Sequence, residues 1–230
     1  MANMPRLTND KGSLVTMANP KSSSSEAYRK LRTNILFSSI DSQIQTIMIA
    51  SALSGEGKTT TIGNLAVAYA QEGKKVLLMD TDLRKPAVHR MFNVPNHVGL
   101  TSVLSSQYKV TEVLRETGVE GLHVLSSGPI PPNPSEMIGS RKMTALLEDL
   151  KEKYDVILFD TPPVLAVTDA LIISSLCDGV ILVVSAGKVK KDLVKKAKSH
   201  LEHVNARILG AVLNNVQVPK GRNANYGENA

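Results

Sequence analysis

Short apolar runs alternate with longer amphipathic stretches through most of this chain. The apolar runs are rich in Val, Ile and Leu, and they predict buried strands at 44–50, 76–80, 122–125, 155–160, 179–184 and 207–213. Helical patterns follow the first run and also cover 26–38, 140–153, 168–175 and 188–204, with two shorter ones within 100–117. Apolar strands that alternate with helices are typical of a mostly parallel sheet. We therefore predict an α/β fold with a doubly wound sheet and helices on both faces.

A loop rich in glycine and serine joins the first predicted strand to the helix after it. It reads SALSGEGKTT, and Gly55, Gly57, Lys58 and Thr59 follow the order of a phosphate-binding loop. Glycines let backbone N–H groups turn toward an anion, and the helix N-terminus adds partial positive charge. Lys58 can reach the outer phosphates, while the Thr59 hydroxyl can bind Mg²⁺. The predicted nucleotide site consists of Ser54, Gly55, Glu56, Gly57, Lys58, Thr59 and Thr60.

Two other interpretations of this loop stay open at the level of residues. The usual phosphate-loop spacing has glycine six residues before Lys58, where this chain has Ala52. A dinucleotide-binding loop would use Gly55 and Gly57, but Thr60 stands in place of its third glycine and Lys58 would have no role. A plain Gly-Ser connection is the third interpretation. Binding of a nucleoside triphosphate explains more of these residues than either alternative, and the fold class is accordingly that of a P-loop NTPase.

Three carboxylates lie at or just beyond the carboxyl ends of predicted strands: Asp80, Asp82 and Asp160. Parallel strands end at one edge of a sheet, so these side chains should approach the phosphate loop. Mg²⁺ prefers one or two carboxylates together with phosphate and water oxygens, and we predict a metal site of Thr59, Asp82 and Asp160. Asp80 is expected to assist an incoming hydroxyl, and the predicted catalytic residues are Lys58, Asp80 and Asp82. The alternative is that each acid only caps a turn or a helix.

Composition narrows the class of protein. The 230 residues, 42% of them hydrophobic and none of them Trp, suit one α/β domain. The single cysteine, Cys177, cannot form an internal disulfide and fits a reducing compartment, and a catalytic thiol is the weaker alternative because no His lies near it in sequence. No stretch approaches the roughly 20 apolar residues that span a bilayer, and the N-terminus lacks the apolar core of a signal peptide. We expect a cytoplasmic protein with no direct membrane span.

A run of lysines lies on the predicted helix 188–204, in a chain of net charge +6. An ordinary solvated helix face explains these lysines, and contact with nucleic acid is the alternative. The aromatic content of 3% argues against stacking on single strands. We therefore do not expect a nucleic-acid partner.

Three motifs in chain order resemble the Walker A, A′ and B motifs of the bacterial tyrosine kinases, cytoplasmic enzymes associated with capsular and exopolysaccharide synthesis. They read SALSGEGKTTTIGNLA, VLLMDTDLRKP and VILFDTPP. The segments SEAYRKLRTNI and SSGPIPPNPSEMI also resemble this family, and the likeness covers about 25–216. Related partition and septum-placement ATPases have an upstream lysine where this chain has Leu53. A switch ATPase that controls binding to a partner or to DNA is the alternative function.

The resemblance implies a protein-tyrosine kinase that uses ATP and Mg²⁺, phosphorylates its own C-terminal tail in trans and acts on tyrosines of other proteins. It also implies that the E-x-x-R-x-x-R motif, here Glu26, Arg29 and Arg32, joins subunits into a homo-oligomeric ring. A membrane-anchored activator on a separate chain would recruit the kinase to the inner face of the cell membrane. Asn214 resembles the residue that contacts adenine in related ATPases, and Asn215 is an equal candidate.

The domain organisation follows from the extent of these motifs and from the polar composition of both ends of the chain. We predict a flexible arm at 1–25, a P-loop kinase domain at 26–216 and a mobile tail at 217–230. Members of the family usually end in a cluster of tyrosines, whereas this tail offers only Tyr226, which is the predicted phosphoacceptor. Prolines prevent the segment at 126–137 from pairing as a strand, and we expect an ordered loop there. Arg84 of the A′ motif is expected to bind phosphate or an adjacent subunit.

Overall fold

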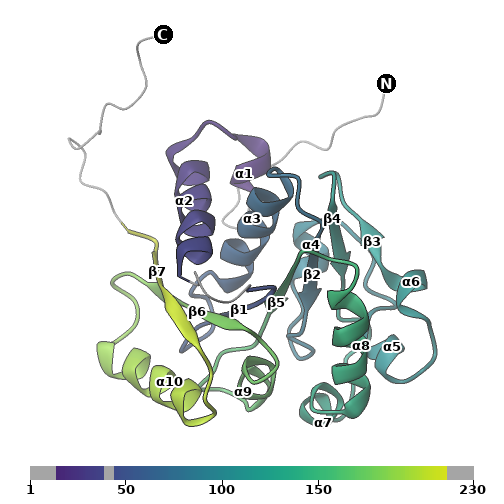
Figure 1. The fold of residues 1–230 in the computed structure, drawn as a ribbon. Coiled ribbons are helices and arrows are strands. Elements are labelled where there is room, and N and C mark those ends of the chain that lie inside the picture. The colour runs from purple at the N-terminus through teal and green to yellow at the C-terminus, as the bar shows by residue number, and fades with distance from the viewer. Residues whose placement is uncertain (1–13, 39–43, 217–230) are drawn as a thin grey trace.

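A seven-stranded sheet forms the centre of the molecule (Figure 1). The computed structural model of the chain describes residues 14–38 and 44–216. The strand order is β3-β4-β2-β5-β1-β6-β7, and every neighbouring pair is parallel except β3 with β4. The strands are β1 Thr46–Ala50, β2 Val76–Asp80, β3 Arg115–Glu116, β4 Leu122–Leu125, β5 Val156–Asp160, β6 Gly179–Ser185 and β7 Ile208–Asn214.

Helices cover both faces of this sheet, which confirms the predicted fold class. Neighbouring residues of a strand point to opposite faces, so Ile47 packs with the first group of helices while Met48 packs with the second. The first group is α1 Val15–Ala18, α2 Ser23–Phe37, α3 Lys58–Ala70 and α4 Val88–Met91. The second is α5 Leu100–Leu104, α6 Val110–Val113, α7 Pro134–Ile138, α8 Arg141–Lys151, α9 Asp169–Ser174 and α10 Lys191–His203.

The position of each strand explains its sequence pattern. Every residue of β1, β2 and β5 is buried, because these strands lie inside the sheet with helices on both faces. No residue of the edge strand β7 is fully buried, and Leu213 is 61% exposed. The carboxyl ends of β1, β2, β5, β6 and β7 therefore meet at one edge, where the predicted site lies.

The N-terminal segment differs from the expectation of a flexible arm as far as residue 25. Residues 15–18 form α1, and α2 begins at Ser23. Thr16 is fully buried, and its backbone N–H donates to Asn64 Oδ1 in α3 at 2.9 Å. The Ser22 side chain accepts from the backbone N–H of Ser25, so it caps the N-terminus of α2. The contact with α3 is distant in sequence, so a local polar pattern could not reveal it.

Two further elements were not expected. The prolines from Pro129 to Pro132 do lie in a loop, but the same segment then forms α7 with Pro134 at its first position. Proline is tolerated at that position because the first N–H of a helix has no partner within the helix. The two-residue strand β3 is too short to produce a pattern. The predicted tail, 217–230, and Tyr226 lie outside the described residues.

Candidate functional site

Two glycines shape the loop between β1 and α3. Gly55 has φ 77° and Gly57 has φ 97°, a region that side chains disfavour. A Cβ atom at Gly57 would lie 2.0 Å from Nδ2 of Asn214, whereas one at Gly55 would meet no atom within 4 Å. Gly57 also precedes the first residue of α3, so its conformation sets the direction of the helix. The loop has the strand-loop-helix setting that a phosphate-binding loop requires.

Lys58 is the first residue of α3, and only 8% of it is exposed. Its Nζ donates to the Ser51 hydroxyl at 3.0 Å, and within the described residues it forms no ion pair. Burial lowers the pKa of Lys58, although the nearby carboxylates of Asp160, Asp82 and Glu56 oppose this shift. The ammonium group therefore stands at the cavity surface with unused donors, as a phosphate ligand would require.

Thr59 and Asp160 meet directly beneath the loop. The Thr59 hydroxyl donates to Asp160 Oδ2 at 2.6 Å, across two segments that lie far apart in sequence. The other oxygen, Oδ1, is buried and accepts no hydrogen bond from any described residue. Burial, with some repulsion from Asp82, raises the pKa of Asp160 to about 6, while Thr59 and Lys58 act in the opposite direction. An unsatisfied buried carboxylate oxygen is costly, and a cation beside it would remove that cost.

These residues fit a magnesium ion that is held jointly with a nucleotide. In the described part of the chain no three His, Cys, Asp or Glu side chains converge to hold a metal on their own. Mg²⁺ typically keeps water and phosphate oxygens and takes only one or two carboxylates from the protein. Thr59 and Asp160 are in contact, and Asp82 lies on the wall of the same cavity. The predicted metal set is thus brought together.

The structure separates Asp80 from Asp82. Asp80 is fully buried and does not line the cavity. Its Oδ2 accepts from the backbone N–H groups of Ala87 and Val88 at 2.9 and 3.0 Å, while Oδ1 accepts from that of Asp82 at 3.3 Å. Burial and repulsion by Asp160 raise its pKa well above the usual value. In this conformation Asp80 organises the chain after β2, and Asp82 is the carboxylate that reaches the cavity.

Glu56 and Asn214 hold the phosphate loop in place. Glu56 is 2% exposed, and its carboxylate accepts from the backbone N–H groups of Leu53 at 2.7 Å and Ser185 at 3.1 Å. The Asn214 side chain donates to the backbone oxygen of Glu56 at 2.9 Å. Both residues were predicted to bind nucleotide, yet in the structure they connect the loop to the ends of β6 and β7. Asn215, which also lines the cavity, donates to the Ser185 hydroxyl instead.

A cavity of about 1420 Å³ collects most of the predicted residues. Of the predicted loop residues, all but the buried Glu56 line it, together with Asp82 and Asn214. Its other walls come from the chain after β2, β5 and β6. The sequence prediction missed several of these residues, namely Lys85, Arg90, Pro162, Pro163 and Lys188. Lys85, Pro162 and Pro163 lie within the A′ and B motifs just after predicted strands, and that position was a signal that could have identified them.

Arg84 connects three segments at the rim of this cavity. Its Nε and Nη2 donate to the two carboxylate oxygens of Asp169 at 2.8 and 3.1 Å, and the Ser135 hydroxyl donates to the same carboxylate at 2.5 Å. Asp169 is fully buried. Burial alone would raise the pKa of Asp169, but the hydrogen bonds from Arg84 and Ser135 outweigh it and lower the pKa. This network was not anticipated from the sequence.

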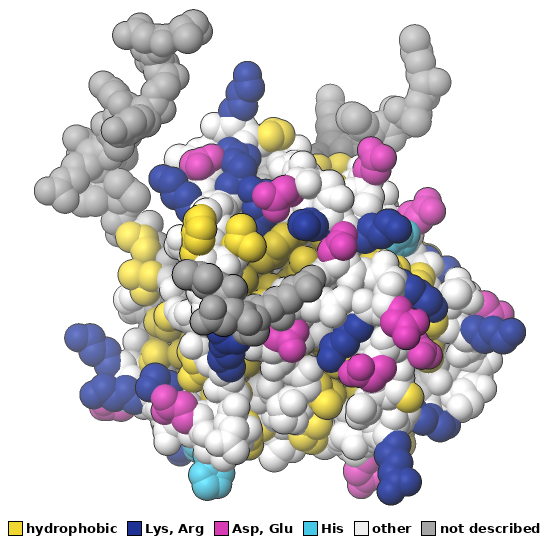
Figure 2. Space-filling model, in the orientation of Figure 1, with side chains coloured by type: hydrophobic (Ala, Val, Ile, Leu, Met, Phe, Trp, Pro, Cys, Tyr) yellow, Lys and Arg dark blue, Asp and Glu magenta, His cyan; other side chains and the backbone are white. Residues whose placement is uncertain are grey.

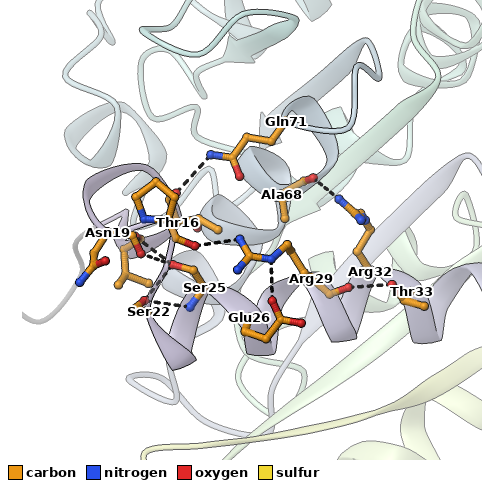
Figure 3. A network of polar contacts seen from close by, with 12 residues as sticks. Thr16, Asn19, Ser22, Ser25, Glu26, Arg29, Arg32, Thr33, Ala68 and Gln71 are labelled. Carbon is orange, nitrogen blue, oxygen red and sulfur yellow. Dashed lines mark hydrogen bonds and ion pairs between the residues drawn. The ribbon is translucent and has the colours of Figure 1, made fainter. Parts of the chain in front are cut away.

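The E-x-x-R-x-x-R residues of α2 make contacts within the chain (Figure 3). Arg29 pairs with Glu26 at 2.8 Å and also donates to the backbone oxygen of Pro20. Arg32 donates to the backbone oxygen of Ala68 at 2.7 Å and pairs with Glu72 at 3.2 Å. None of the three predicted interface residues lines the large cavity. Their role between subunits stays a prediction.

The lysines at 188–198 are all exposed around α10 and the turn before it. One of them, Lys198, pairs with Glu202 at 2.6 Å. On the face shown in Figure 2, Lys and Arg side chains are interspersed with Asp and Glu. This distribution suits a solvated surface. Among residues 14–38 and 44–216, no helix combines the length and the apolar character needed to cross a bilayer.

Comparison with known proteins agrees with this geometry. Residues 44–209 match the family described as AAA domain. The tyrosine-protein kinase YwqD of Bacillus subtilis is 48% identical over 93% of this chain and 90% of its own length. The putative tyrosine-protein kinase CapB of Staphylococcus aureus is 42% identical over 90% of each chain.

Solved structures show the same likeness. The crystal structure of the chimerical protein CapA2B2 superposes with a TM-score of 0.88 at 45% identity, covering 91% of this chain and 92% of its own. The septum site-determining protein MinD of Pyrococcus horikoshii, solved with Mg-ADP, superposes with a TM-score of 0.64 at 29% identity over 74% of this chain and 69% of its own. The predicted P-loop NTPase type of the fold is confirmed.

Proposed function

This chain belongs to the bacterial tyrosine kinase family, and from that premise we propose that it transfers the γ-phosphoryl group of Mg·ATP to tyrosine hydroxyls, including its own Tyr226. The chain is a protein-tyrosine kinase by its family. The observation that carries the detailed proposal is the contact of Thr59 with the buried Asp160, beside a large cavity that Lys58 and Thr59 line.

The phosphate loop supplies the donor side of the reaction. Backbone groups of Ser54 to Thr60 would surround the phosphates, and Lys58 would neutralise charge on the γ-phosphoryl group as it transfers. Thr59, Asp160 and Asp82 are the residues that would hold Mg²⁺, which supplies further charge neutralisation when bound. Glu56 and Asn214 keep the loop fixed by their links to β6 and β7, so little reorganisation is needed when ATP binds.

On the acceptor side, catalysis depends more on how the tyrosine hydroxyl is positioned than on a strong base. Phosphoryl transfer passes through a loose transition state in most analyses, so positioning and charge stabilisation supply most of the catalysis. Asp82 is the carboxylate at the cavity surface, and we assign it the contact with the incoming hydroxyl, direct or through water. Asp80 is buried behind it, so its role is to position the segment that carries Asp82.

Assembly and regulation extend the same proposal. We infer that the kinase forms a homo-oligomeric ring through Glu26, Arg29 and Arg32, in which tails are phosphorylated in trans. Glu26 is half exposed and could reach a neighbour, which supports this role. A solved structure of a chimerical protein, CapA2B2, supports association with a second protein. By the family resemblance, that second protein would be membrane-anchored. That partner would recruit the kinase to the inner face of the membrane, where it regulates capsular or exopolysaccharide synthesis.

Transfer of label from ATP tests this proposal. The full chain is incubated with γ-labelled ATP and Mg²⁺, with and without a candidate activator fragment, and labelled residues are mapped by mass spectrometry. Phosphotyrosine at Tyr226 that disappears in Lys58→Met, but persists in Lys195→Met, is the expected result. Labelled Lys58→Met would refute the assigned role of the loop. Release of free phosphate without labelled protein, in the presence of the activator, would instead support a switch ATPase.

A further inference from the structure

The cavity is larger than one nucleotide site requires. Pockets for a single small ligand typically have volumes of about 300–1,000 Å³, compared with about 1420 Å³ here. Its walls extend from the end of β2 to the end of β7, which are four strand spacings apart in the sheet. At about 4.8 Å per spacing, the opening is roughly 19 Å wide. This width leaves room for a second molecule beside the nucleotide.

The β2 side of the cavity is the part that the nucleotide site does not explain. The phosphate loop follows β1, and Asn214 lies on the far side at the end of β7. The chain after β2 is two strand spacings from β1 in the opposite direction, or about 10 Å away. Three cationic side chains of the segment after β2 line the cavity, namely Arg84, Lys85 and Arg90.

Two of these three cations have no acidic partner among residues 14–38 and 44–216. Arg84 is already engaged by the buried carboxylate of Asp169. Lys85 and Arg90 are exposed, and neither forms an ion pair within the described residues. One Arg90 nitrogen donates to the backbone oxygen of Pro86 at 3.1 Å, and no described group accepts from the Lys85 ammonium. Both cations are therefore available to a ligand.

The fold holds this pair in a defined position. Asp82 Oδ1 accepts from the backbone N–H of Lys85 at 2.9 Å, and Asp80 Oδ2 accepts from those of Ala87 and Val88. Pro86 fixes its own φ between these contacts. The backbone of the segment that carries both cations is thus tied to the two carboxylates of the β2 end, so both side chains start from a fixed place beside the acceptor side of the site.

We propose that Lys85 and Arg90 form an acceptor subsite that binds a carboxylate near the target tyrosine, so that the enzyme prefers acidic tyrosine-containing segments. This inference rests on the proposed kinase function and specifies its substrate class. Complementary charge at the rim of a binding site mainly gives specificity and raises the association rate. The tail of the chain itself carries such a segment, with Glu228 two residues after Tyr226.

Peptide binding and phosphotransfer together test the subsite. The probes are the octapeptide NANYGENA, its Glu228→Gln form and its Glu228→Lys form, each with an amidated C-terminus. The protein is the full chain with Tyr226→Phe, saturated with Mg²⁺ and either a non-hydrolysable ATP analogue for fluorescence anisotropy or ATP for turnover. We expect the native octapeptide to bind about five- to tenfold more tightly than the Lys form, the size of one or two exposed ion pairs.

Reversing the charges of Lys85 and Arg90 gives the more decisive test of the subsite. The Lys85→Glu/Arg90→Glu double variant, measured at saturating nucleotide, should prefer the Lys peptide. The matched control, Lys195→Glu/Lys196→Glu, changes the net charge equally on α10 and should keep the native preference. A double variant that still prefers the native peptide over the Lys peptide would overturn the subsite. That conclusion holds even if the variant binds the nucleotide with a different affinity.

The outcomes separate this inference from the kinase function beneath it. Equal binding and equal turnover of all three peptides would reject the subsite while the kinase function stands. Charge-selective binding without transfer to any peptide, even with an activator fragment, would reject the kinase function while the binding site stands. Failure of both readouts would reject both.

Discussion

Asp160 is a carboxylate that the fold holds in an unfavourable surrounding. It is 1% exposed, and the raised pKa shows that its charged form is disfavoured before a cation binds. We predict that Asp160→Asn increases the free energy of unfolding of the nucleotide-free protein at pH 8 by roughly 1–3 kcal/mol, because a neutral amide replaces a buried charge. Urea denaturation measures this change.

The same substitution should weaken the effect of Mg²⁺ on nucleotide affinity. Asp82, Thr59 and the phosphates remain, but one of the two carboxylates assigned to the cation is lost, so calorimetry with ADP should show a smaller gain from Mg²⁺ than in the wild type. The wild type serves as the control, since Mg²⁺ should strengthen its binding. A destabilised Asp160→Asn protein that responds to Mg²⁺ as strongly as the wild type would contradict this account.

Gly57 and Gly55 share a left-handed backbone but differ in their surroundings. A Cβ at Gly57 would meet the Asn214 side chain, which is fixed by its bond to Glu56. We predict that Gly57→Ala costs roughly 2–4 kcal/mol of stability, from strain plus overlap, and weakens ATP binding. Gly55→Ala, whose Cβ meets no atom of the described residues within 4 Å, should cost only about 1 kcal/mol. Adding Asn214→Ala should restore part of the loss at Gly57, and equal losses at both glycines would exclude the overlap as the cause.

The order of residues in the loop made much of the site predictable. The spacing of Gly55, Gly57, Lys58 and Thr59 encodes the phosphate loop locally, and strand ends identified Asp160 as its partner. The hydrogen bonds by which Glu56 holds the loop were not predictable, because its carboxylate accepts from a backbone N–H that lies 129 positions away in the chain. The type of residue indicates which chemical group is present, whereas a contact between residues far apart in sequence, such as that of Glu56 with Ser185, depends on the folded structure.

At the scale of elements, α2 is attached to α3 through Arg32. The Ala68 carbonyl lies in the last turn of α3, where carbonyl groups lack partners within the helix, and Arg32 donates to it. We predict that Arg32→Ala lowers the free energy of unfolding by about 1–2 kcal/mol, because it leaves this carbonyl without its donor. Thermal unfolding of dilute, monomeric protein is the measurement.

Glu26→Ala is the matched variant on the same helix. Its ion pair with Arg29 is exposed, so its loss should change stability by less than about 0.5 kcal/mol. If Glu26 contacts a neighbouring subunit, this variant should reduce oligomer formation in sedimentation experiments without lowering the melting temperature. An unchanged melting temperature for Arg32→Ala would show that the contact with α3 contributes nothing measurable.

The long, periodic elements were the predictable ones. The expected helices at 140–153 and 188–204 correspond to α8 and α10, and the apolar runs correspond to β1, β2 and β4 to β7. The short elements α1, α7 and β3 were missed because their stability comes from tertiary contacts and not from a repeating pattern. Thr16 in α1 illustrates this, since its partner lies in α3.

At the scale of the whole molecule, strand order brings the site together. Alternation of strands and helices predicted a parallel sheet, but the insertion of β5 between β1 and β2 is visible only in the structure. This insertion places Asp160 between the phosphate loop and the chain after β2. It also sets the width of the cavity, which a list of motifs could not provide.

The network of Arg84, Ser135 and Asp169 joins three separate connections at this edge of the sheet. Arg84 follows β2, Ser135 lies in α7 and Asp169 begins α9. Arg84→Ala would leave the buried Asp169 carboxylate without its charged partner, so we predict a loss of roughly 2–4 kcal/mol in the free energy of unfolding at pH 7. Lys85→Ala, the neighbouring exposed cation, should change it by less than about 0.5 kcal/mol.

The pH dependence of this loss identifies its cause. The fold lowers the pKa of Asp169 below the value of 3.8 expected in the unfolded chain. Its contribution to stability is therefore complete above pH 3.8 and is lost as the pH falls through the lower, folded pKa. Denaturation curves measured from pH 7 to pH 3 should show the free energies of unfolding of the wild type and Arg84→Ala converging as the pH falls below about 4. A difference in free energy of unfolding that stays constant across this range would mean that Arg84 stabilises the edge of the sheet by packing. Ser135 and the other surroundings of Asp169 would then stabilise its buried charge without Arg84.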